Sequence, residues 1–471
     1  MSNQPTSRPV SSAPQMSTRP TTTPGTRPPV ITRPAAPQVD AAKQRLWSLD
    51  AFRGATMLLL VSEIDGAVRP IAKALAKPVT ENAFDFWSFA NFHTSHIPWI
   101  GASLWDMIQP SFMFMVGTAM AFSYAKREEK GQSYWRMLFH AVIRSVLLIL
   151  LGVFLRSKGS SGGLNWTFED VITQIGLGYL LVFLLWKTPT WVKAGAVLAI
   201  LAIYWGLFAF WPLPQNKDFE KWIPEKGAAK QEVILEGFEA HWTKNANLAH
   251  YFDRWFLNQF PRPMNKEGKQ PAFEANGGGY QTLNFIPAAV TMLLGLMAGE
   301  LLRGPRGAWA KWGILVASGI VLVLVGYGVD LAGVGPIIKR IWTPSWTLWS
   351  GGVCILILAG FYLLFDLLPL KYLAYPLVVV GANSLLVYTI HSTMAGTILH
   401  WWKLVFPAVD GKDIFHRALA WYDEIAMTRF PDYALGANLE TFVPLAHTIA
   451  ITLTVWVLCL WLYRQRCFVR I

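Results

Sequence analysis

Residues 312–329 read WGILVASGIVLVLVGYGV and contain no charged side chain. A helix rises about 1.5 Å per residue, so this run is about 27 Å long, close to the thickness of the hydrocarbon core of a bilayer. Inside lipid, backbone N–H and C=O groups must form hydrogen bonds within the protein, which only an α-helix or a closed β-barrel allows. The run therefore predicts a membrane-spanning α-helix.

Nine further apolar runs of similar length accompany it. They cover approximately residues 46–62, 103–125, 138–155, 168–186, 192–211, 283–302, 346–367, 375–398 and 442–462. Two long polar segments, 212–282 and 400–441, interrupt the series. The sequence thus predicts an all-α integral membrane protein, a bundle of about ten transmembrane helices with two larger extracytoplasmic loops.

Composition agrees with a membrane protein. Hydrophobic residues make up 53% of the chain and charged residues only 15%, which is unlike a soluble domain. The net charge of +12 lies in loops between apolar runs, so we predict no nucleic-acid binding. The three cysteines have no metal-ligand spacing, which argues against a zinc site or a disulfide framework.

Loop charges predict the orientation. Lys and Arg concentrate in alternate connections, at 126–136, 187–193, 303–311 and 464–470, which should be cytoplasmic together with both termini. Residues 1–44 are rich in Pro, Ser, Thr and Arg and predict a disordered cytoplasmic tail, whereas 45–471 form one polytopic transmembrane domain. Four basic residues fall on the outward side, against the pattern: Arg156, Lys158, Lys339 and Arg340.

One stripe of basic residues follows the third apolar run. Arg136, His140 and Arg144 recur every four residues and share a helix face over about 12 Å, where they can hold the phosphates of an anionic ligand. Alternatively, Arg136 extends to the lipid headgroups, whereas Arg144 lies two turns deeper and needs a partner.

A second polar stripe lies in the ninth apolar run. Ser384, Tyr388 and His391 share a face, with Asn383 beside them. They are candidates for binding a substrate near the outer surface, and hydrogen bonding between helices is the alternative.

The outward segment 93–110 reads HTSHIPWIGASLWDMIQP and gathers two imidazoles and a carboxylate. An imidazole can take a proton from an attacking amine or hydroxyl, and a nearby carboxylate can fix its tautomer. This makes His96 and Asp106 candidates for a general base and its partner. Ser103 followed by Asp106 also fits a capping box at a helix start, and both roles are compatible. His93 and His96 lack a third ligand, so we predict no metal.

An ordered series of motifs resembles the heparan-alpha-glucosaminide N-acetyltransferase family and its bacterial membrane homologues. The matching pieces cover most of the spanning region. They are RLWSLDAFRG (45–54), HIPWIG (96–101), WDMIQP (105–110), FMVG (114–117), VITQIGLGY (171–179), YFDR (251–254), LGLMAG (294–299), KRIWTPS (339–345) and GANSLLVY (381–388).

This resemblance implies a transmembrane acyltransferase that uses cytoplasmic acetyl-CoA to acetylate an amino group of an external sugar. The family's catalytic histidine falls on His96 and its aspartate on Asp106. Asp50 and Arg53 fall at the cytoplasmic end, where they contact the cofactor or form an ion pair that locks helices. The chain departs from the family at Glu63, where Asn is usual, at Thr173-Gln174, where Gln-Arg is usual, and in its outer loops.

The sequence therefore predicts transfer of an acyl group, acetyl by resemblance, from acetyl-CoA across the membrane to a small-molecule or glycan acceptor. Glu63, His93 and the polar stripe of the ninth run are the predicted acceptor-binding residues. A secondary transporter or flippase for a sugar or lipid-linked substrate is the alternative, and a nonenzymatic scaffold is the third. The expected location is a bacterial inner membrane. The oligomeric state is left open, a homo-oligomer included.

Overall fold

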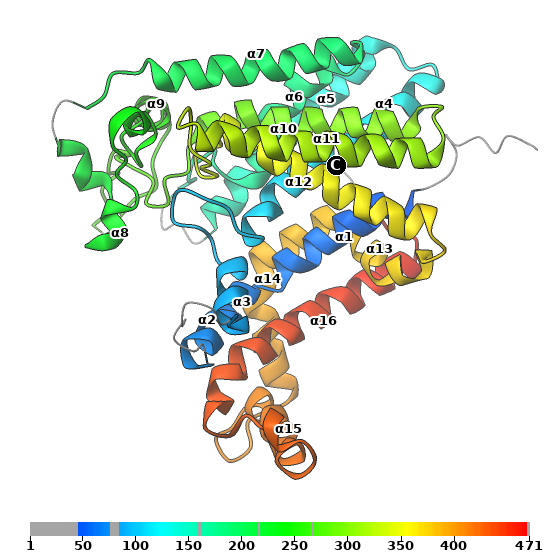
Figure 1. Cartoon of the computed structure of the whole chain (residues 1–471). Helices are drawn as coiled ribbons and strands as arrows, with labels where there is room; N and C mark the ends of the chain where they lie inside the picture. The colour runs from blue at the N-terminus through cyan, green and yellow to red at the C-terminus, as the bar shows by residue number, and fades with distance from the viewer. Residues whose placement is uncertain (1–45, 76–83, 159–162, 215–216, 266, 469–471) are drawn as a thin grey trace, which may run out of the picture. The chain divides into compact units, whose positions relative to one another are not determined.

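The computed structural model describes residues 46–75, 84–158, 163–214, 217–265 and 267–468. Within these ranges the regular structure is helical, apart from two isolated bridges, and no named strand occurs (Figure 1). The predicted tail at 1–44 lies outside the described residues. The helices are α1 Trp47–Val61, α2 Ile64–Leu75, α3 Phe86–Thr94, α4 Ile108–Glu129, α5 Tyr134–Ser157, α6 Val171–Leu185, α7 Thr190–Ala209, α8 Ala228–Gln231, α9 Leu248–Phe256, α10 Phe285–Arg303, α11 Ala308–Leu331, α12 Pro344–Tyr362, α13 Tyr375–Gly381, α14 Ser384–Val405, α15 Ile414–Arg429 and α16 Val443–Arg464.

Each predicted apolar run forms helix, which confirms an all-α integral membrane protein. In the described part of the chain, six helical segments are long and apolar enough to cross a bilayer, and they contain α5, α7, α10, α11, α12 and α16. The ninth run is broken: the helical segments 371–381 and 384–405 meet at a bend of 56° and make a seventh span if they are counted as one. The predicted number of ten is therefore not confirmed.

The remaining three runs fall short for physical reasons. α1 and α6 have 15 residues each, which corresponds to about 22 Å of helix, less than the core of a typical bilayer. α4 has 22 residues but carries polar side chains near its start and ends in Lys126, Arg127, Glu128 and Glu129. These three runs therefore stay predicted spans.

α4 and α10 pack closely against each other. A Cβ atom on Gly117 would overlap the carbonyl oxygen of Met292, and one on Gly295 would overlap the carbonyl oxygen of Phe114. Thr118 lies beside this contact and donates a hydrogen bond of 3.1 Å to the carbonyl of Gly295. Small residues allow such approach of two helix backbones in a membrane. The two backbones are consequently in direct contact.

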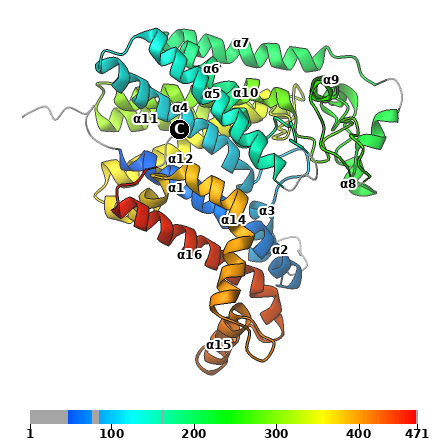
Figure 2. The same cartoon turned by 180° about the vertical axis from the view of Figure 1, so that it is seen from behind.

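α1 connects two groups of helices. One group contains α4, α5, α6, α7, α10, α11 and α12, and the other contains α13, α14 and α16 (Figures 1 and 2). In the first group α1 packs on α4 and α12. In the second it packs on all three helices. Trp47 at the start of α1 and Tyr463 near the end of α16 join one hydrophobic cluster with Phe365. Both ends of the described segment therefore lie at the same end of the bundle.

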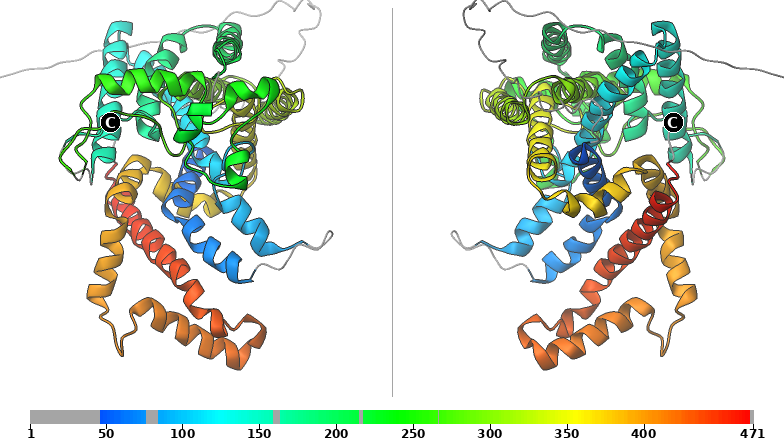
Figure 3. Two further views of the ribbon diagram at one scale, coloured as in Figure 1. Left: turned by 90° about the vertical axis from the view of Figure 1, so that its left-hand side faces the viewer. Right: turned by 90° about the vertical axis from the view of Figure 1, so that its right-hand side faces the viewer.

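The long loop between α7 and α10 folds against the loop that precedes α12. Trp99, Tyr204, Trp242 and Ile338 are buried together in one hydrophobic cluster, although they come from four distant parts of the chain. α8 and α9 lie in this loop segment, at the end of the helices shown on the left of Figure 1 and facing the viewer in the left panel of Figure 3. The cluster positions the candidate site described next.

Candidate active site

A short loop between α3 and α4 carries the candidate catalytic pair. Asp106 lies in a single 3₁₀ turn, Trp105–Met107, immediately before α4. Ser103 Oγ accepts a hydrogen bond from the amide of Asp106 at 3.3 Å, and Asp106 Oδ2 accepts one from the amide of Ser103 at 3.3 Å. These reciprocal bonds confirm the predicted capping box. They also fix the direction of the Asp106 side chain.

The second oxygen of the same carboxylate meets His96. Nδ1 of His96 lies 2.7 Å from Asp106 Oδ1, and the Asp106 side chain is only 2% exposed. The imidazole is 43% exposed, and its hydrogen bonds to described residues all involve Nδ1. The buried carboxylate thus holds one edge of the ring, which leaves Nε2 for a ligand.

A third side chain completes this arrangement. Lys339 Nζ lies 3.0 Å from Asp106 Oδ1 and 3.2 Å from His96 Nδ1, and the lysine side chain is 7% exposed. Burial alone raises the pKa of the Asp106 carboxyl, but the hydrogen bond to His96 and the charge of Lys339 outweigh it. The pKa of Asp106 therefore lies well below its usual range, and the group is a carboxylate at neutral pH.

The backbone ties the two segments of the site together. The amide of Gly101 donates to the carbonyl of Ile337 at 2.9 Å, and Arg340 donates to the carbonyl of Ile97 at 3.3 Å. Trp99 Nε1 also donates to the carbonyl of Trp242 at 3.0 Å. The loop bearing His96 is consequently held by segments that follow it by more than a hundred residues.

Sequence reasoning did not assign Lys339 to the site. The signal was present, because Lys339 and Arg340 are basic residues on the side where the charge pattern expects few. A buried carboxylate as partner explains that exception for Lys339.

The predicted acceptor-binding residues do not form one cluster. Glu63 Oε1 lies 3.6 Å from His391 Nε2, which brings together the end of α1 and the middle of α14. Glu63 has a φ of 44°, a left-handed conformation that is uncommon for a residue other than glycine and here accompanies the turn into α2. This contact thus joins Glu63 and His391, two of the predicted acceptor-binding residues.

The other members of that set have separate partners. Tyr388 donates a hydrogen bond of 3.1 Å to Asp170, and buried Asn383 donates to the carbonyl of Cys467 at 3.2 Å. Ser384 is half-buried at the first turn of α14, next to the bend. The His93 ring lies tilted against that of Phe89, with ring centroids 4.4 Å apart, and among the described residues no hydrogen bond joins it to His96 or Asp106. These four residues are therefore not assembled around His96.

The predicted cofactor residues lie along two helices. Arg136 and His140 are exposed on α5, whereas Arg144 is half-buried, with its guanidinium carbon 5.1 Å from the ring centre of Tyr179. On α1, Arg53 pairs with Asp50 at 3.5 Å. The polar pocket described next is not lined by the α5 stripe.

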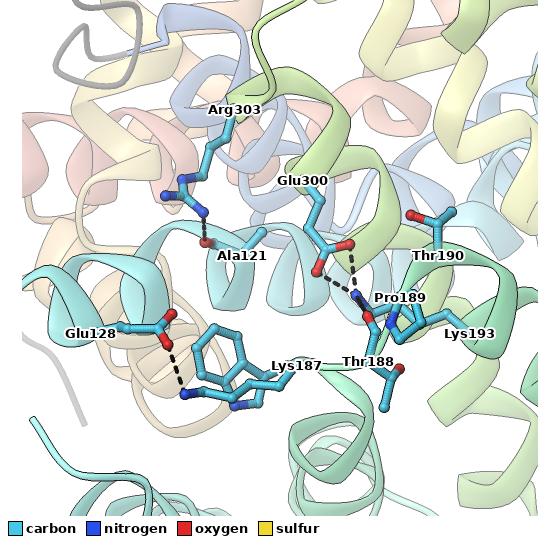
Figure 4. Close-up of a pocket in the computed structure, with 10 residues that line it drawn as sticks. Ala121, Glu128, Lys187, Thr188, Pro189, Thr190, Lys193, Glu300 and Arg303 are labelled. Carbon is cyan, nitrogen blue, oxygen red and sulfur yellow. Dashed lines mark hydrogen bonds and ion pairs between the residues drawn. The ribbon is translucent and has the colours of Figure 1, made fainter.

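A polar pocket of about 380 Å³ lies instead between the ends of α4, α6, α7 and α10 (Figure 4). In it Lys193 contacts Glu300 at 2.6 and 2.8 Å and Lys187 contacts Glu128 at 2.7 Å. Three of the four connections predicted to be cytoplasmic, 126–136, 187–193 and 303–311, contribute residues here. Along α4, Asp106 lies about 22 Å from Ala121 and about 33 Å from Glu128 of this pocket. Its lining residues are Ala121, Glu128, Trp186, Lys187, Thr188, Pro189, Thr190, Lys193, Glu300 and Arg303.

In the described part of the chain, no group of three or more His, Cys, Asp or Glu residues is arranged to hold a metal ion. The buried cysteines Cys354 and Cys459 are free, as is the exposed Cys467.

Comparison with known proteins adds a relationship to this geometry. No family model matches the chain. The chain is 24% identical over 402 residues to heparan-alpha-glucosaminide N-acetyltransferase of Mus musculus and 22% identical over 410 residues to the Homo sapiens protein of that name. These alignments cover 77% and 79% of this chain, but 56% of each relative, so the chain spans about half the length of the curated relatives it matches. The resemblance of the ordered motifs is thereby confirmed, and the chain is a distant relative of the heparan-alpha-glucosaminide N-acetyltransferases.

Proposed function

We propose that this protein is a membrane acyltransferase that moves an acetyl group from cytoplasmic acetyl-CoA to an acceptor on the other side of the bilayer. The observation that carries the proposal is the 2.7 Å contact between His96 Nδ1 and the buried Asp106 carboxylate, in a ring whose other nitrogen is left for a ligand. The names of the two relatives support acetyl transfer. An amino sugar or another glycan is the proposed acceptor class.

The chemistry follows from the tautomer. Asp106 accepts a hydrogen bond from the protonated Nδ1, so the lone pair of a neutral imidazole lies on Nε2. As the acceptor nitrogen attacks the thioester carbonyl, Nε2 takes its proton; the carbon to sulfur bond then breaks and the imidazolium returns the proton to the departing thiolate. A two-step route through an acetylated His96 needs the same residues and leads to the same products.

Both ligands require sites at opposite ends of the helices. We propose that the CoA phosphates bind at the cytoplasmic end, where Arg144 is the deepest cation of the α5 stripe, and that the pantetheine arm extends between helices towards His96. The Glu63 carboxylate, which contacts His391, suits an acceptor whose amino group donates a hydrogen bond to it.

One observation supports the alternative function, a transporter. The bend of 56° between the α13 and α14 segments resembles the discontinuous helices from which carriers build binding sites near the bilayer midplane. A carrier would move its substrate unchanged. Product chemistry therefore separates the two functions.

The deciding experiment uses proteoliposomes in which the protein has a single orientation. Acetyl-CoA is supplied only on the side of the connection between α4 and α5, and a panel of amino and hydroxyl sugars only on the other. We expect an acetylated sugar on the acceptor side and free CoA on the donor side. Movement of intact sugar without any acetylated product would establish the transporter instead.

Variants connect this activity to the site. His96→Ala should lower the rate by about two to four powers of ten while CoA binding, measured by titration calorimetry, stays close to wild type. Asp106→Asn should retain a small residual rate, because a misoriented base still functions part of the time. His400→Ala, at an exposed histidine of α14, is the matched control and should keep full activity.

A further inference from the structure

We propose that Lys339 is a positioning residue that keeps the His96 imidazole neutral by balancing the charge of Asp106. The role rests on the function proposed above, in which His96 must offer a lone pair on Nε2. Three atoms carry the inference: His96 Nδ1, Asp106 Oδ1 and Lys339 Nζ, which are separated from one another by 2.7, 3.0 and 3.2 Å.

Hydrogen-bonding rules assign the protons in this triangle. A carboxylate has only acceptor sites, so the 2.7 Å contact requires a proton on Nδ1 of His96. Nδ1 then has no lone pair for Lys339, and the ammonium donates to Asp106 Oδ1 at 3.0 Å. The remaining 3.2 Å separation of Nζ from Nδ1 is an approach of a cation to the ring, without a hydrogen bond.

Charge counting gives the consequence. With a neutral imidazole, the carboxylate and the ammonium sum to zero. Protonation of Nε2 would place a second positive charge beside the Lys339 ammonium, which is itself 7% exposed. Without Lys339, the carboxylate alone would favour the imidazolium, and a proton would occupy the nitrogen that the reaction needs.

A second cation, Arg340, lies next to the site. Arg340, which follows Lys339, donates to the carbonyls of Ile97 and Gly278 and so approaches the backbone after His96. It adds positive charge, in the same sense as Lys339. The nearest aromatic neighbour, Trp105, has its ring centre 6.5 Å from that of His96 and carries no charge.

Backbone hydrogen bonds fix the position of Lys339. The amide of Gly101 donates to the carbonyl of Ile337, and Ile338 is fully buried in the cluster that also contains Trp99. The carbonyl of Lys339 accepts a hydrogen bond of 3.0 Å from Trp342. Lys339 is therefore fixed to the loop that bears His96, and the distance between the two side chains has little freedom.

The test measures the availability of the His96 lone pair directly, besides activity. Diethyl pyrocarbonate modifies neutral imidazoles, so the pH dependence of modification at His96, followed by peptide mass spectrometry, gives a midpoint. For Lys339→Met we expect that midpoint, and the acidic limb of the acetyl-transfer profile, to move up by about one pH unit or more. Lys339→Arg should restore both.

Two further variants complete the design. Lys244→Met removes another fully buried lysine, paired with Glu225 in the loop after α7, and should leave the midpoint unchanged. Lys339→Met combined with Asp106→Asn leaves neither charge unpaired, so it remains informative where Lys339→Met alone does not fold. Its midpoint should lie above that of Asp106→Asn alone, because a cation beside the ring has been removed.

The outcomes separate the two proposals. If folded Lys339→Met and wild type share one midpoint, the lysine is structural and the inference is wrong. If the midpoints shift as expected but wild-type protein forms no acetylated product, the relationship of Lys339 to His96 stands and the acyltransferase function fails.

Discussion

Arg156 Nε lies 3.5 Å from Oδ2 of Asp170, at the end where the loop-charge pattern predicts few basic residues. The other three exceptions to the pattern also have partners. Lys158 donates to the carbonyl of Thr393, Lys339 to Asp106, and Arg340 to two backbone carbonyls. Because these four residues form contacts within the protein, the Lys and Arg residues of the opposite connections are used to predict the orientation.

Thiol labelling tests that orientation. We expect Leu104→Cys, at a side chain 52% exposed beside the candidate site, to react with an impermeant maleimide added outside intact cells. Lys130→Cys, in the connection between α4 and α5, should react only after the membrane is opened. Both changes are made in a Cys467→Ser background, because the other two cysteines are buried. Labelling in the opposite order would invert the topology and remove the proposed mechanism.

The cofactor proposal predicts a difference between two arginines of α5. Arg144→Gln should weaken CoA binding more than Arg136→Gln, because Arg144 is half-buried over Tyr179 whereas solvent can replace the exposed Arg136. The measurement is titration calorimetry of purified protein with CoA. Equal affinities in wild type and both variants would exclude the stripe. Loss of folded Arg144→Gln protein with normal affinity in the remainder would show that the Tyr179 contact is structural.

Helix packing predicts a large effect of one methyl group. Gly117→Ala should destabilise the protein by about 1 to 3 kcal/mol or more, because the new Cβ would overlap the Met292 carbonyl oxygen and must push two backbones apart. Gly313→Ala in α11 is the control, since a Cβ there meets open space. Thermal unfolding in detergent, followed by tryptophan fluorescence, gives the comparison. Similar midpoints for the two variants would contradict the close contact of α4 and α10.

A buried carboxyl in α9 predicts a pH dependence of stability. Burial raises the pKa of Asp253 to about 7, and the hydrogen bond from the amide of Thr282 offsets only part of that rise. A raised pKa in the folded state means that this group's stabilisation is complete below its unfolded pKa, about 4, and is lost as pH rises through about 7. Stability should therefore fall between these values.

Asp253→Asn isolates this contribution. The amide keeps an acceptor for Thr282 but does not ionise, so the variant should lose part of the fall in unfolding temperature between pH 5 and pH 8 and exceed wild type at pH 8. Glu169, whose pKa is also raised by burial, remains and contributes its own slope. An unchanged slope in Asp253→Asn would mean that Asp253 is already ionised throughout this range.

Hydropathy sufficed to predict the helical fold, because every apolar run must form hydrogen bonds internally in lipid. It could not predict how far each helix spans. The run at 375–398 has the composition of one span, yet its backbone bends by 56° beside Asn383, which donates to the carbonyl of Cys467 near the end of the chain. That contact joins residues 84 positions apart, and no local pattern contains it.

The candidate site could also be predicted only in part. His96 and Asp106 are ten residues apart, so a short segment already suggested their pairing. Lys339 is 233 residues from Asp106 and reaches it only because a hydrophobic cluster joins the two loops. The stripe at Ser384, Tyr388 and His391 was predicted as one surface from helical spacing, but Tyr388 turns to Asp170 and His391 to Glu63.

The direct backbone contact between α4 and α10 fixes the position of α4 along its neighbour. Carbonyl oxygens lie against glycines on both helices, so α4 cannot slide along its neighbour without a collision, and an inserted residue would rotate everything beyond it by about 100°. Asp106 precedes this helix and Glu128 of the polar pocket lies in its last turn. The separation of Asp106 from Glu128, about 33 Å along the helix, is therefore set by the number of residues in α4.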